Sequence, residues 1–207
     1  MSVYEAYKNW ASTYDSDKNL TRDLDEIVTK ATLSKGQYQS ILEIGCGTGK
    51  NTRLLAEIGT AVHALDFSES MIEQAQAKLD AKNVTFAVAD LTKRWPVDEA
   101  MADLVVCNLV LEHIEDLNFI FAEACRALAD NGRFFVCEYH PFRQYQGGKA
   151  TFYRGQETIK IPAFVHHISE FLNAAKANGI ALKNLQEWQN ETDEIPRLVS
   201  FMFEKSD

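Results

Sequence analysis

The stretch LEIGCGTGKNTRLL, residues 42–55, places three glycines between an apolar run and a run that favours a helix. Gly45, Gly47 and Gly49 stand at every second position. Glycine lacks a Cβ atom, so the backbone there can adopt positive φ and a ligand can lie directly against it. A buried strand that turns into a helix in this way is typical of the first unit of a parallel α/β sheet, where ligands bind at the carboxyl ends of strands.

Short apolar runs alternate with helical patterns through the middle of the chain. Buried strands are predicted at residues 40–45, 61–66, 84–90, 103–109 and 133–139. Helices are predicted between them at residues 50–58, 69–81 and 116–130, the last ending at Asn131-Gly132. Repetition of strand and helix predicts a parallel sheet with helices on both faces and right-handed crossovers.

The two ends of the chain depart from this alternation. Residues 166–180 have the pattern of a helix that is stopped by Asn178-Gly179. After it, strand-like runs at 181–189 and 197–205 are joined by a short connection, so we expect them to pair antiparallel. Residues 3–33 have the pattern of two helices broken at YDSDKN. Residues 140–165 form the longest irregular stretch, and we expect a hairpin around YRGQET. Its many aromatic side chains fit either a lid over a substrate pocket or a cover for the sheet edge or a homodimer interface.

The composition indicates one folded domain. The 207 residues are 46% hydrophobic and 25% charged, and no linker or repeat divides them. We therefore expect a single domain over 1–207, with an N-terminal helical cap at 1–35 and a lid insertion at 140–165. The formal charge of -9 disfavours nucleic acid, and no segment approaches the roughly 18 apolar residues that span a bilayer. The four cysteines lack metal-ligand spacing, which predicts reduced thiols, no metal site and a cytoplasmic protein.

The glycine turn differs from a dinucleotide site. A dinucleotide fingerprint is GxGxxG, whereas here Lys50 stands where the third glycine would be. Glu43 would repel a pyrophosphate, so the ligand should carry a cation near this turn. Asp66 closes the second strand, where a carboxylate can bind both hydroxyls of a ribose, and Asp90 closes the third, where it can bind an exocyclic amine. An ammonium group, a ribose and an aminopurine without phosphate describe S-adenosylmethionine.

Together these elements resemble the class I S-adenosylmethionine-dependent methyltransferases, in the small-molecule group called type 11. The family pattern is matched by E-x-GxGxG at 43–49, by the acidic residues Asp66 and Asp90, and by NLVLEHI at 108–114. The resemblance covers about residues 14–203. It implies a Rossmann-like, doubly wound α/β sheet of seven strands in the order 3-2-1-4-5-7-6, with an antiparallel last strand.

The resemblance also implies roles for individual residues. It places the methionine part of the cofactor at the glycine turn and Glu43, the ribose at Asp66 and the adenine at Asp90, with the Asn108 carbonyl facing the ammonium group. The expected cofactor contacts are Tyr14, Glu43, Gly45, Gly47, Gly49, Asp66, Phe67, Asp90, Leu91 and Asn108. As alternatives, the two aspartates would only cap helices, and Tyr14 would only attach the first helix to the sheet.

The implied activity is methyl transfer from S-adenosylmethionine to oxygen, nitrogen or carboxylate of a small-molecule acceptor, without a nucleic-acid or membrane partner. His140 and His167 are the candidate catalytic residues, as base or acceptor anchor near neutral pH. His113 is interpreted as structural. A carboxylate acceptor would need no base, and Arg143 or Arg154 would orient it. Two other classes stay open: a non-catalytic partner subunit that binds S-adenosylmethionine, and a nicotinamide-dependent oxidoreductase.

Overall fold

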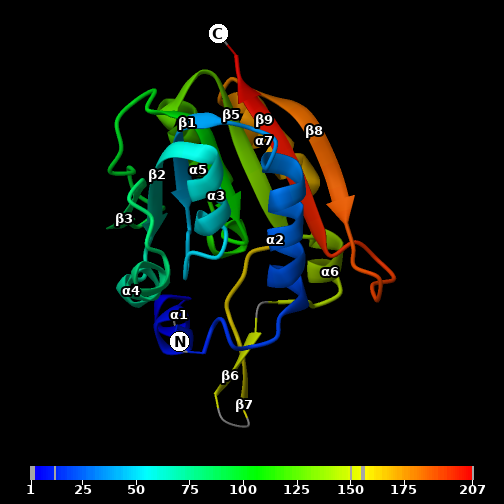
Figure 1. Cartoon of the computed structure of the whole chain (residues 1–207). Coiled ribbons are helices and arrows are strands. Elements are labelled where there is room, and N and C mark those ends of the chain that lie inside the picture. The colour runs from blue at the N-terminus through cyan, green and yellow to red at the C-terminus, as the bar shows by residue number, and fades with distance from the viewer. Residues whose placement is uncertain (1–2, 12, 150, 155–156, 207) are drawn as a thin grey trace.

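The computed structural model describes residues 3–11, 13–149, 151–154 and 157–206, and within them a twisted central sheet carries helices on both faces (Figure 1). The sheet has seven strands in the order β3-β2-β1-β4-β5-β9-β8. Strand β9 pairs antiparallel with both β5 and β8, and the other pairs are parallel. The bounds are β1 (Tyr38–Ile44), β2 (Gly59–Asp66), β3 (Val84–Val88), β4 (Ala102–Asn108), β5 (Leu128–Tyr139), β8 (Ile180–Trp188) and β9 (Leu198–Lys205). This is the predicted 3-2-1-4-5-7-6 order with its antiparallel last strand.

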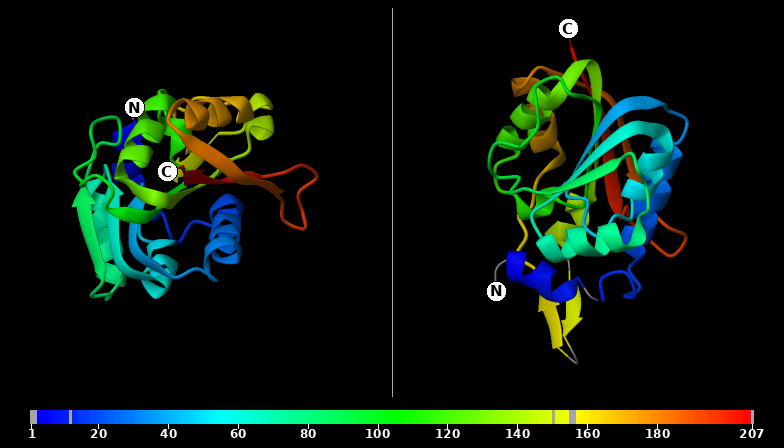
Figure 2. Two further views of the ribbon diagram at one scale, coloured as in Figure 1. Left: turned by 90° about the horizontal axis from the view of Figure 1, so that it is seen from above. Right: turned by 60° about the vertical axis from the view of Figure 1, so that its left-hand side comes forward.

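The helices form two layers, which the view from above separates clearly (Figure 2). Helices α2 (Leu20–Leu33) and α3 (Thr52–Ile58) pack on one face, and α5 (Leu117–Ala127) and α7 (Ile168–Ala177) on the other. Strand β1 divides its side chains between these layers, with Ile41 facing α2 and α3, and Leu42 facing α5 and α7. Burial of both faces explains why the strands read as continuous apolar runs.

Polar side chains fix where three of the helices begin. Asn19 accepts hydrogen bonds from the first amides of α2, Ser68 accepts one from Met71 N–H in α4 (Glu69–Lys78), and Asp116 accepts one from Phe119 N–H in α5. Each cap satisfies amides that have no partner inside the helix. The cap at Ser68 also brings the start of α4 close to the end of β2.

One predicted helix end was wrong and one was confirmed. Helix α5 ends at Ala127, because Leu128 is fully buried and pairs with Ala102, so the chain enters β5 directly and Asn131-Gly132 lies inside that strand. There, sheet pairing overrides the local helical pattern. Helix α7 ends at Ala177 with Asn178 as its C-cap and Gly179 at a φ of 70°, which is the predicted stop at Asn178-Gly179.

The segments at 3–33 and 140–165 follow the predicted outline. The first gives α1 (Val3–Trp10) and α2, separated by the YDSDKN connection. The second contains α6 (Pro141–Tyr145) and a hairpin of β6 (Thr151–Arg154) and β7 (Glu157–Lys160), which projects from the body (Figures 1 and 2). Gly155 and Gln156 of the predicted YRGQET turn lie outside the described residues. That this segment acts as a lid, and that 1–35 acts as a cap within a single domain, stay predictions.

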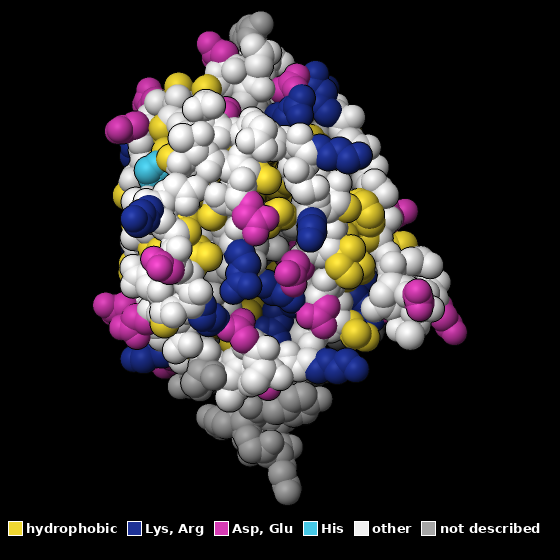
Figure 3. Space-filling view, in the orientation of Figure 1, with side chains coloured by type: hydrophobic (Ala, Val, Ile, Leu, Met, Phe, Trp, Pro, Cys, Tyr) yellow, Lys and Arg dark blue, Asp and Glu magenta, His cyan; other side chains and the backbone are white. Residues whose placement is uncertain are grey.

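No helix in the described part of the chain has the length and apolar character that crossing a bilayer requires. All four cysteines are free thiols. On the face that carries α2, basic side chains stand among acidic ones rather than forming a continuous patch (Figure 3). Lys50, for example, pairs with Asp23 and Glu26 at 3.0 and 3.3 Å.

Candidate active site

A cavity of about 470 Å³ opens where the carboxyl ends of β1 to β4 meet α1. Its size lies within the roughly 300–1,000 Å³ usual for small-molecule sites. Eight of the ten expected cofactor contacts line it: Tyr14, Gly45, Gly47, Asp66, Phe67, Asp90, Leu91 and Asn108. Glu43 and Gly49 do not. The convergence follows from topology, since parallel strands bring their carboxyl ends to one edge of the sheet.

The three glycines of the turn are needed for different reasons, two for packing and one for ligand space. All three have positive φ, at 75°, 52° and 80°. A Cβ at Gly45 would lie 2.1 Å from Val110 Cγ2, and one at Gly49 would lie 3.1 Å from Ala75 Cβ in α4. A Cβ at Gly47 would meet nothing within 4 Å, although Gly47 lines the cavity. Gly47 therefore leaves room for a ligand, whereas Gly45 and Gly49 allow neighbouring segments to pack.

Asp66 connects the glycine turn to the end of β2. Its Oδ2 accepts a hydrogen bond from Gly47 N–H and its Oδ1 accepts one from Ser68 N–H, both at 2.8 Å. Burial raises the pKa of this carboxyl to about 6, although the backbone amides oppose the shift. Each carboxylate oxygen has more than one lone pair, so Asp66 can still accept two ligand hydroxyls. The helix cap of α4 is Ser68 rather than Asp66, and the contacts of Asp66 to the turn leave it able to bind a ribose.

Asp90 lies at the rim of the cavity, after β3. Its Oδ1 accepts hydrogen bonds from the Thr92 hydroxyl at 2.6 Å and the Thr92 amide at 3.0 Å, and Lys93 is 3.0 Å from Oδ2. The Thr92 hydrogen bond is the main reason that the pKa of Asp90 is lowered. The side chain is 47% exposed and stays charged at neutral pH.

Tyr14 lines the cavity and also attaches the connection between α1 and α2 to the rest of the protein. Its ring packs edge-on against Trp10, and the Arg22 guanidinium stacks on it 4.0 Å from the ring centroid. Arg22 also donates hydrogen bonds to the backbone carbonyls of Tyr14 and Asp17. Tyr14 therefore makes the contacts expected of a residue that attaches the N-terminal segment, and it also lies where a cofactor contact is expected.

Glu43 points away from the cavity. Ile41, two residues earlier in β1, faces α2 and α3, and Glu43 on the same side accepts a hydrogen bond from the Thr52 hydroxyl of α3 at 2.6 Å. The carboxyl is 4% exposed, and burial raises its pKa to about 8. The structure does not bring Glu43 into contact with the cavity, so its role toward the methionine part stays a prediction.

Tyr7 and His113 form a hydrogen-bonded pair on the cavity wall. His113 Nδ1 lies 3.1 Å from the Pro162 carbonyl, which only accepts, so we assign the ring proton to Nδ1. Nε2 is then the acceptor for the Tyr7 hydroxyl at 2.8 Å. Burial lowers the pKa of His113, which keeps the ring neutral, and burial raises the pKa of Tyr7. The sequence interpretation treated His113 as structural and did not identify Tyr7.

His140 lies outside this cavity and caps α6. Its Nδ1 accepts a hydrogen bond from Phe142 N–H, and its Nε2 lies 2.8 Å from Glu187 Oε1. Both ring nitrogens are therefore engaged in contacts that position α6 against β8.

His167 also lies away from the cavity, at the start of α7. Its Nδ1 lies 2.5 Å from the Tyr145 hydroxyl, and its amide donates to Glu170 Oε2. The geometry thus brings neither predicted catalytic histidine to the cavity, because each begins a helix on the α6 and α7 side. Their catalytic role has no supporting contact and stays a prediction.

Neither arginine that was expected to orient a carboxylate acceptor is placed at the cavity by the structure. Arg143 donates to the carbonyls of Ile195 and Pro196 and pairs with Asp193 at 2.7 Å. The side chain of Arg154 lies outside the described part of the chain.

A buried carboxyl that the sequence did not single out shapes the far wall of the cavity. Glu138 Oε1 accepts hydrogen bonds from the amides of Val110 and Leu111, both at 2.9 Å. Burial raises the pKa of Glu138 to about 8. These bonds hold the turn after β4, which presents Val110 to Gly45 and His113 to Tyr7.

The charge of the cavity selects the kind of ligand it accepts. Asp66 and Asp90 line it, and no lysine or arginine does so among the described residues. Phe67 and Leu91 add apolar surface between the two carboxylates. Two acids beside an apolar slot, with space above Gly47, fit a nucleoside that carries positive charge and do not fit a pyrophosphate. The described residues contain no group of three or more His, Cys, Asp or Glu that would hold a metal ion.

Comparison with known proteins gives a consistent result. Residues 42–136 match a family described as a methyltransferase domain. The malonyl-[acyl-carrier protein] O-methyltransferase of Hahella chejuensis is 35% identical over 137 residues, which is 65% of this chain and 48% of that protein. The demethylmenaquinone methyltransferase of Tropheryma whipplei is 26% identical over 168 residues, or 81% of this chain and 65% of that protein. The chain thus spans about half the length of the first of these relatives.

A solved structure extends the comparison to the whole fold. The N-methyltransferase NodS from Bradyrhizobium japonicum WM9, in complex with S-adenosyl-L-homocysteine, superposes with a TM-score of 0.77. The match covers 100% of both chains at 17% sequence identity. The glycine turn, the strand order and the matched residues agree: residues 42–136 are similar to the type 11 methyltransferase-domain family, and the chain has the fold of the class I S-adenosylmethionine-dependent methyltransferases.

Proposed function

We propose that the chain binds S-adenosylmethionine in the cavity above Gly47 and transfers its methyl group to a small-molecule acceptor. The observation that carries this proposal is a cavity of nucleoside size whose charged side chains are both acidic. Asp66 would accept hydrogen bonds from the ribose hydroxyls, and Asp90 would accept one from the adenine amine. Phe67 and Leu91 would pack on the base.

The aromatic residues of α1 form one side of this cavity. Tyr4 and Tyr7 each meet the ring of Phe67 edge-on, with centroids 5.9 Å apart. Both line the cavity together with Val3. A dry, shaped site strengthens the attraction between its carboxylates and a cationic ligand.

S-adenosylmethionine supplies a methyl group that its sulfonium already activates, so the protein's task is alignment and proton removal. The Tyr7 oxygen can accept a hydrogen bond from the nucleophile of the acceptor. Its own proton can pass to His113 Nε2, which is unprotonated in the assigned tautomer. This pair is our candidate for general base catalysis when the acceptor is a hydroxyl or an amine.

The relatives support a small or carrier-bound acceptor without identifying it. Their names refer to malonyl-[acyl-carrier protein] and to demethylmenaquinone, which are chemically different acceptors. One fold hosts both activities, so the acceptor has to be inferred from the residues around the site of this chain.

Calorimetric titration with S-adenosylmethionine and S-adenosylhomocysteine tests the proposal. Asp66→Ala should weaken both ligands about 10- to 100-fold, because it removes a buried charged acceptor. Asp103→Ala is the matched control, since Asp103 accepts backbone hydrogen bonds from Gln39 and Ser40 at the opposite end of β1. Equal affinities in both variants, or no binding to the wild type, would contradict the proposed site.

Two further titrations separate the alternatives. Binding of reduced nicotinamide cofactor in place of S-adenosylmethionine would indicate an oxidoreductase. Binding of S-adenosylmethionine without methyl transfer to any acceptor, in the presence and absence of other proteins, would indicate a non-catalytic subunit.

A further inference from the structure

A second cavity of about 340 Å³ adjoins the first. Tyr7, Tyr14 and Leu109 line both cavities, which therefore meet at these three side chains. The second cavity lies at the ends of β4 and β5, where Leu109 and Tyr139 are found, and against the start of α2. A molecule there would be adjacent to a cofactor bound in the first cavity.

The charge of the second cavity is opposite to that of the first. Four basic residues line it: Lys18, Arg22, Lys149 and Arg197. Its acidic lining residue among those described is Glu112, and burial raises the pKa of that carboxyl to about 7. This basic site occurs in a chain with a formal charge of -9, so it is not a consequence of overall composition.

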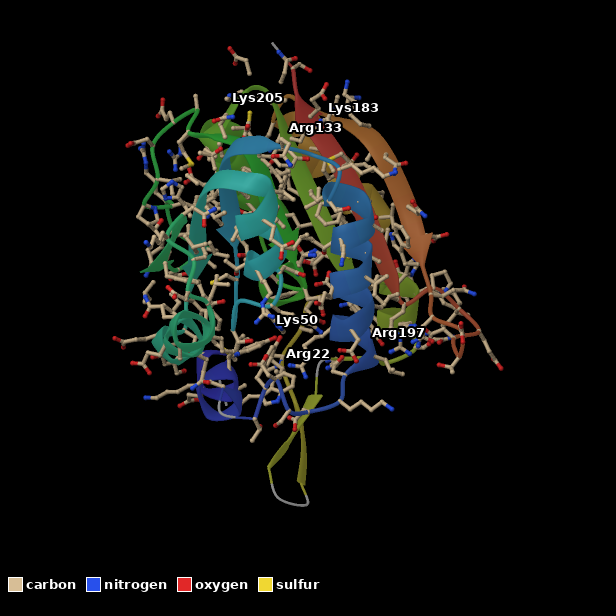
Figure 4. All side chains as sticks on the ribbon, viewed as in Figure 1. Arg22, Lys50, Arg133, Lys183, Arg197 and Lys205 are labelled. Atoms are coloured by element: carbon tan, nitrogen blue, oxygen red, sulfur yellow. The ribbon has the colours of Figure 1, made fainter. Side chains whose placement is uncertain are left out.

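Two of the four basic residues already have partners. Arg22 donates to the carbonyls of Tyr14 and Asp17, and Arg197 pairs with Asp193. Figure 4 shows Arg22 beside the lower end of α2 and Arg197 beside the start of β9, so the two lie on different elements around the cavity.

Lys18 and Lys149, unlike the two arginines, have no partner among the described residues. Both are exposed, and neither forms a hydrogen bond or ion pair within the described part of the chain. The first turn of α2, whose dipole is positive at that end, also faces the cavity through Leu20 and Thr21. The second cavity therefore has uncompensated positive charge.

We propose that this second cavity binds the methyl acceptor, and that the acceptor is a small aromatic or apolar carboxylic acid whose carboxylate is anchored by Lys18 and Lys149. The proposal rests on the proposed function. Aromatic lining by Trp10 and Tyr139 matches an apolar or aromatic body.

The position of the cations also indicates which atom is methylated. Lys18 and Lys149 line the second cavity but not the first, whereas Tyr7, Tyr14 and Leu109 line both. An anchored carboxylate is thus held away from the cofactor, and a separate hydroxyl or amine of the acceptor extends past Tyr7 to the methyl group. Its proton passes through Tyr7 to His113, its oxygen or nitrogen bonds to the methyl carbon, and the carbon–sulfur bond breaks with both electrons remaining on sulfur.

Binding to the protein saturated with S-adenosylhomocysteine tests the charge preference. The probes are 4-hydroxybenzoate and 2-aminobenzoate, each beside its neutral amide, with 4-hydroxyphenyl phosphate as a second anion. We expect each acid to bind about tenfold more tightly than its amide. Equal binding of acid and amide would overturn the proposal, and preference for the phosphate would overturn the carboxylate assignment.

Variants then locate the charges responsible. The double variant Lys18→Met and Lys149→Met should reduce the acid-over-amide preference to less than about threefold, with the affinity for S-adenosylhomocysteine unchanged. Lys183→Met is the control, because it removes a lysine at the opposite end of the sheet (Figure 4). A preference that persists in the double variant would refute the anchoring role. If the wild type does not bind S-adenosylhomocysteine, the proposed function is refuted instead. Failure of the acceptor proposal and failure of the proposed function therefore give different results.

The chemistry of the product tests the methylated atom. With labelled S-adenosylmethionine, the product should retain a free carboxylate and resist mild alkali, as an ether or a methylated amine does. An alkali-labile methyl ester would show that the carboxylate itself is the nucleophile and would overturn the arrangement inferred from the two cavities.

Discussion

Replacing Glu43 with glutamine should flatten the pH dependence of the stability of this protein. Glu43 is 4% exposed and accepts a hydrogen bond from Thr52, and burial raises its pKa from 4.5 to about 8. The native carboxyl therefore holds a proton between these values, whereas the unfolded chain has lost it. A native state that binds more protons than the unfolded state loses stability as pH rises.

The magnitude follows from the two pKa values. Between pH 5 and pH 8, linkage with a pKa of 4.5 in the unfolded chain and about 8 in the native protein removes about 3 to 4 kcal/mol of unfolding free energy. Glutamine has nearly the same shape and can accept the same hydrogen bond from Thr52, but it does not ionise. The stability difference, variant minus wild type, should therefore increase by the same amount, about 3 to 4 kcal/mol, over this pH range.

Urea unfolding at pH 5, 6, 7 and 8 measures this difference directly, with the slope on denaturant serving as a check that unfolding stays two-state. Glu57→Gln is the control, because Glu57 is an exposed residue of α3 and its replacement removes a charge without changing the buried site. Parallel pH curves for wild type and Glu43→Gln would refute the argument that the buried carboxyl is protonated. The same variant tests the cofactor role predicted for Glu43. If Glu43 contacts the methionine part directly, Glu43→Gln should bind S-adenosylmethionine more weakly than the wild type does.

Three further substitutions test, one at a time, the packing of the glycine turn, the space for the ligand and the removal of a proton. Gly45→Ala should lower the unfolding free energy by about 2 kcal/mol or more in urea titrations, because φ is 75° and the new Cβ would lie 2.1 Å from Val110 Cγ2. Gly47→Ala should cost only about 1 kcal/mol of stability but weaken S-adenosylhomocysteine at least about tenfold in calorimetry, because its Cβ fills the cavity. Tyr7→Phe removes the hydroxyl that contacts His113, and should slow methyl transfer to a hydroxyl or amine about 100-fold without changing S-adenosylhomocysteine affinity; unchanged turnover would exclude the pair from proton removal.

The positions around the first cavity could be predicted because they depend on local signals and on one topological rule. Gly45 and Gly47 are recognised by spacing, and Asp66 and Asp90 by their place at strand ends. The rule that parallel strands present their carboxyl ends at one edge then brings these residues together without any knowledge of side-chain packing. The structure places all four on one cavity.

Residues whose position depends on long-range packing could not be predicted in the same way. The Tyr7 and His113 side chains meet across 106 positions of sequence, and the contact exists only because α1 docks over the carboxyl edge of the sheet. Glu43 lies next to the glycine turn, but the side of β1 that it faces is hidden in the sequence, because both faces of a central strand are apolar. His140 and His167 were suggested by their aromatic neighbourhood, and helix capping takes both away from the cavity.

The division of charge between the two cavities predicts that cofactor binding and acceptor binding depend on different parts of this chain. An anionic acceptor would be repelled by Asp66 and Asp90 if it shared their cavity, so it needs a separate compartment that meets the first at side chains without formal charge. The basic residues that create this compartment, including Lys18 and Lys149, all lie outside residues 42–136, the part that matches the methyltransferase domain. Acceptor choice can therefore change through the N-terminal helices and the segments after β5, while the glycine turn and the strand-end aspartates stay as they are.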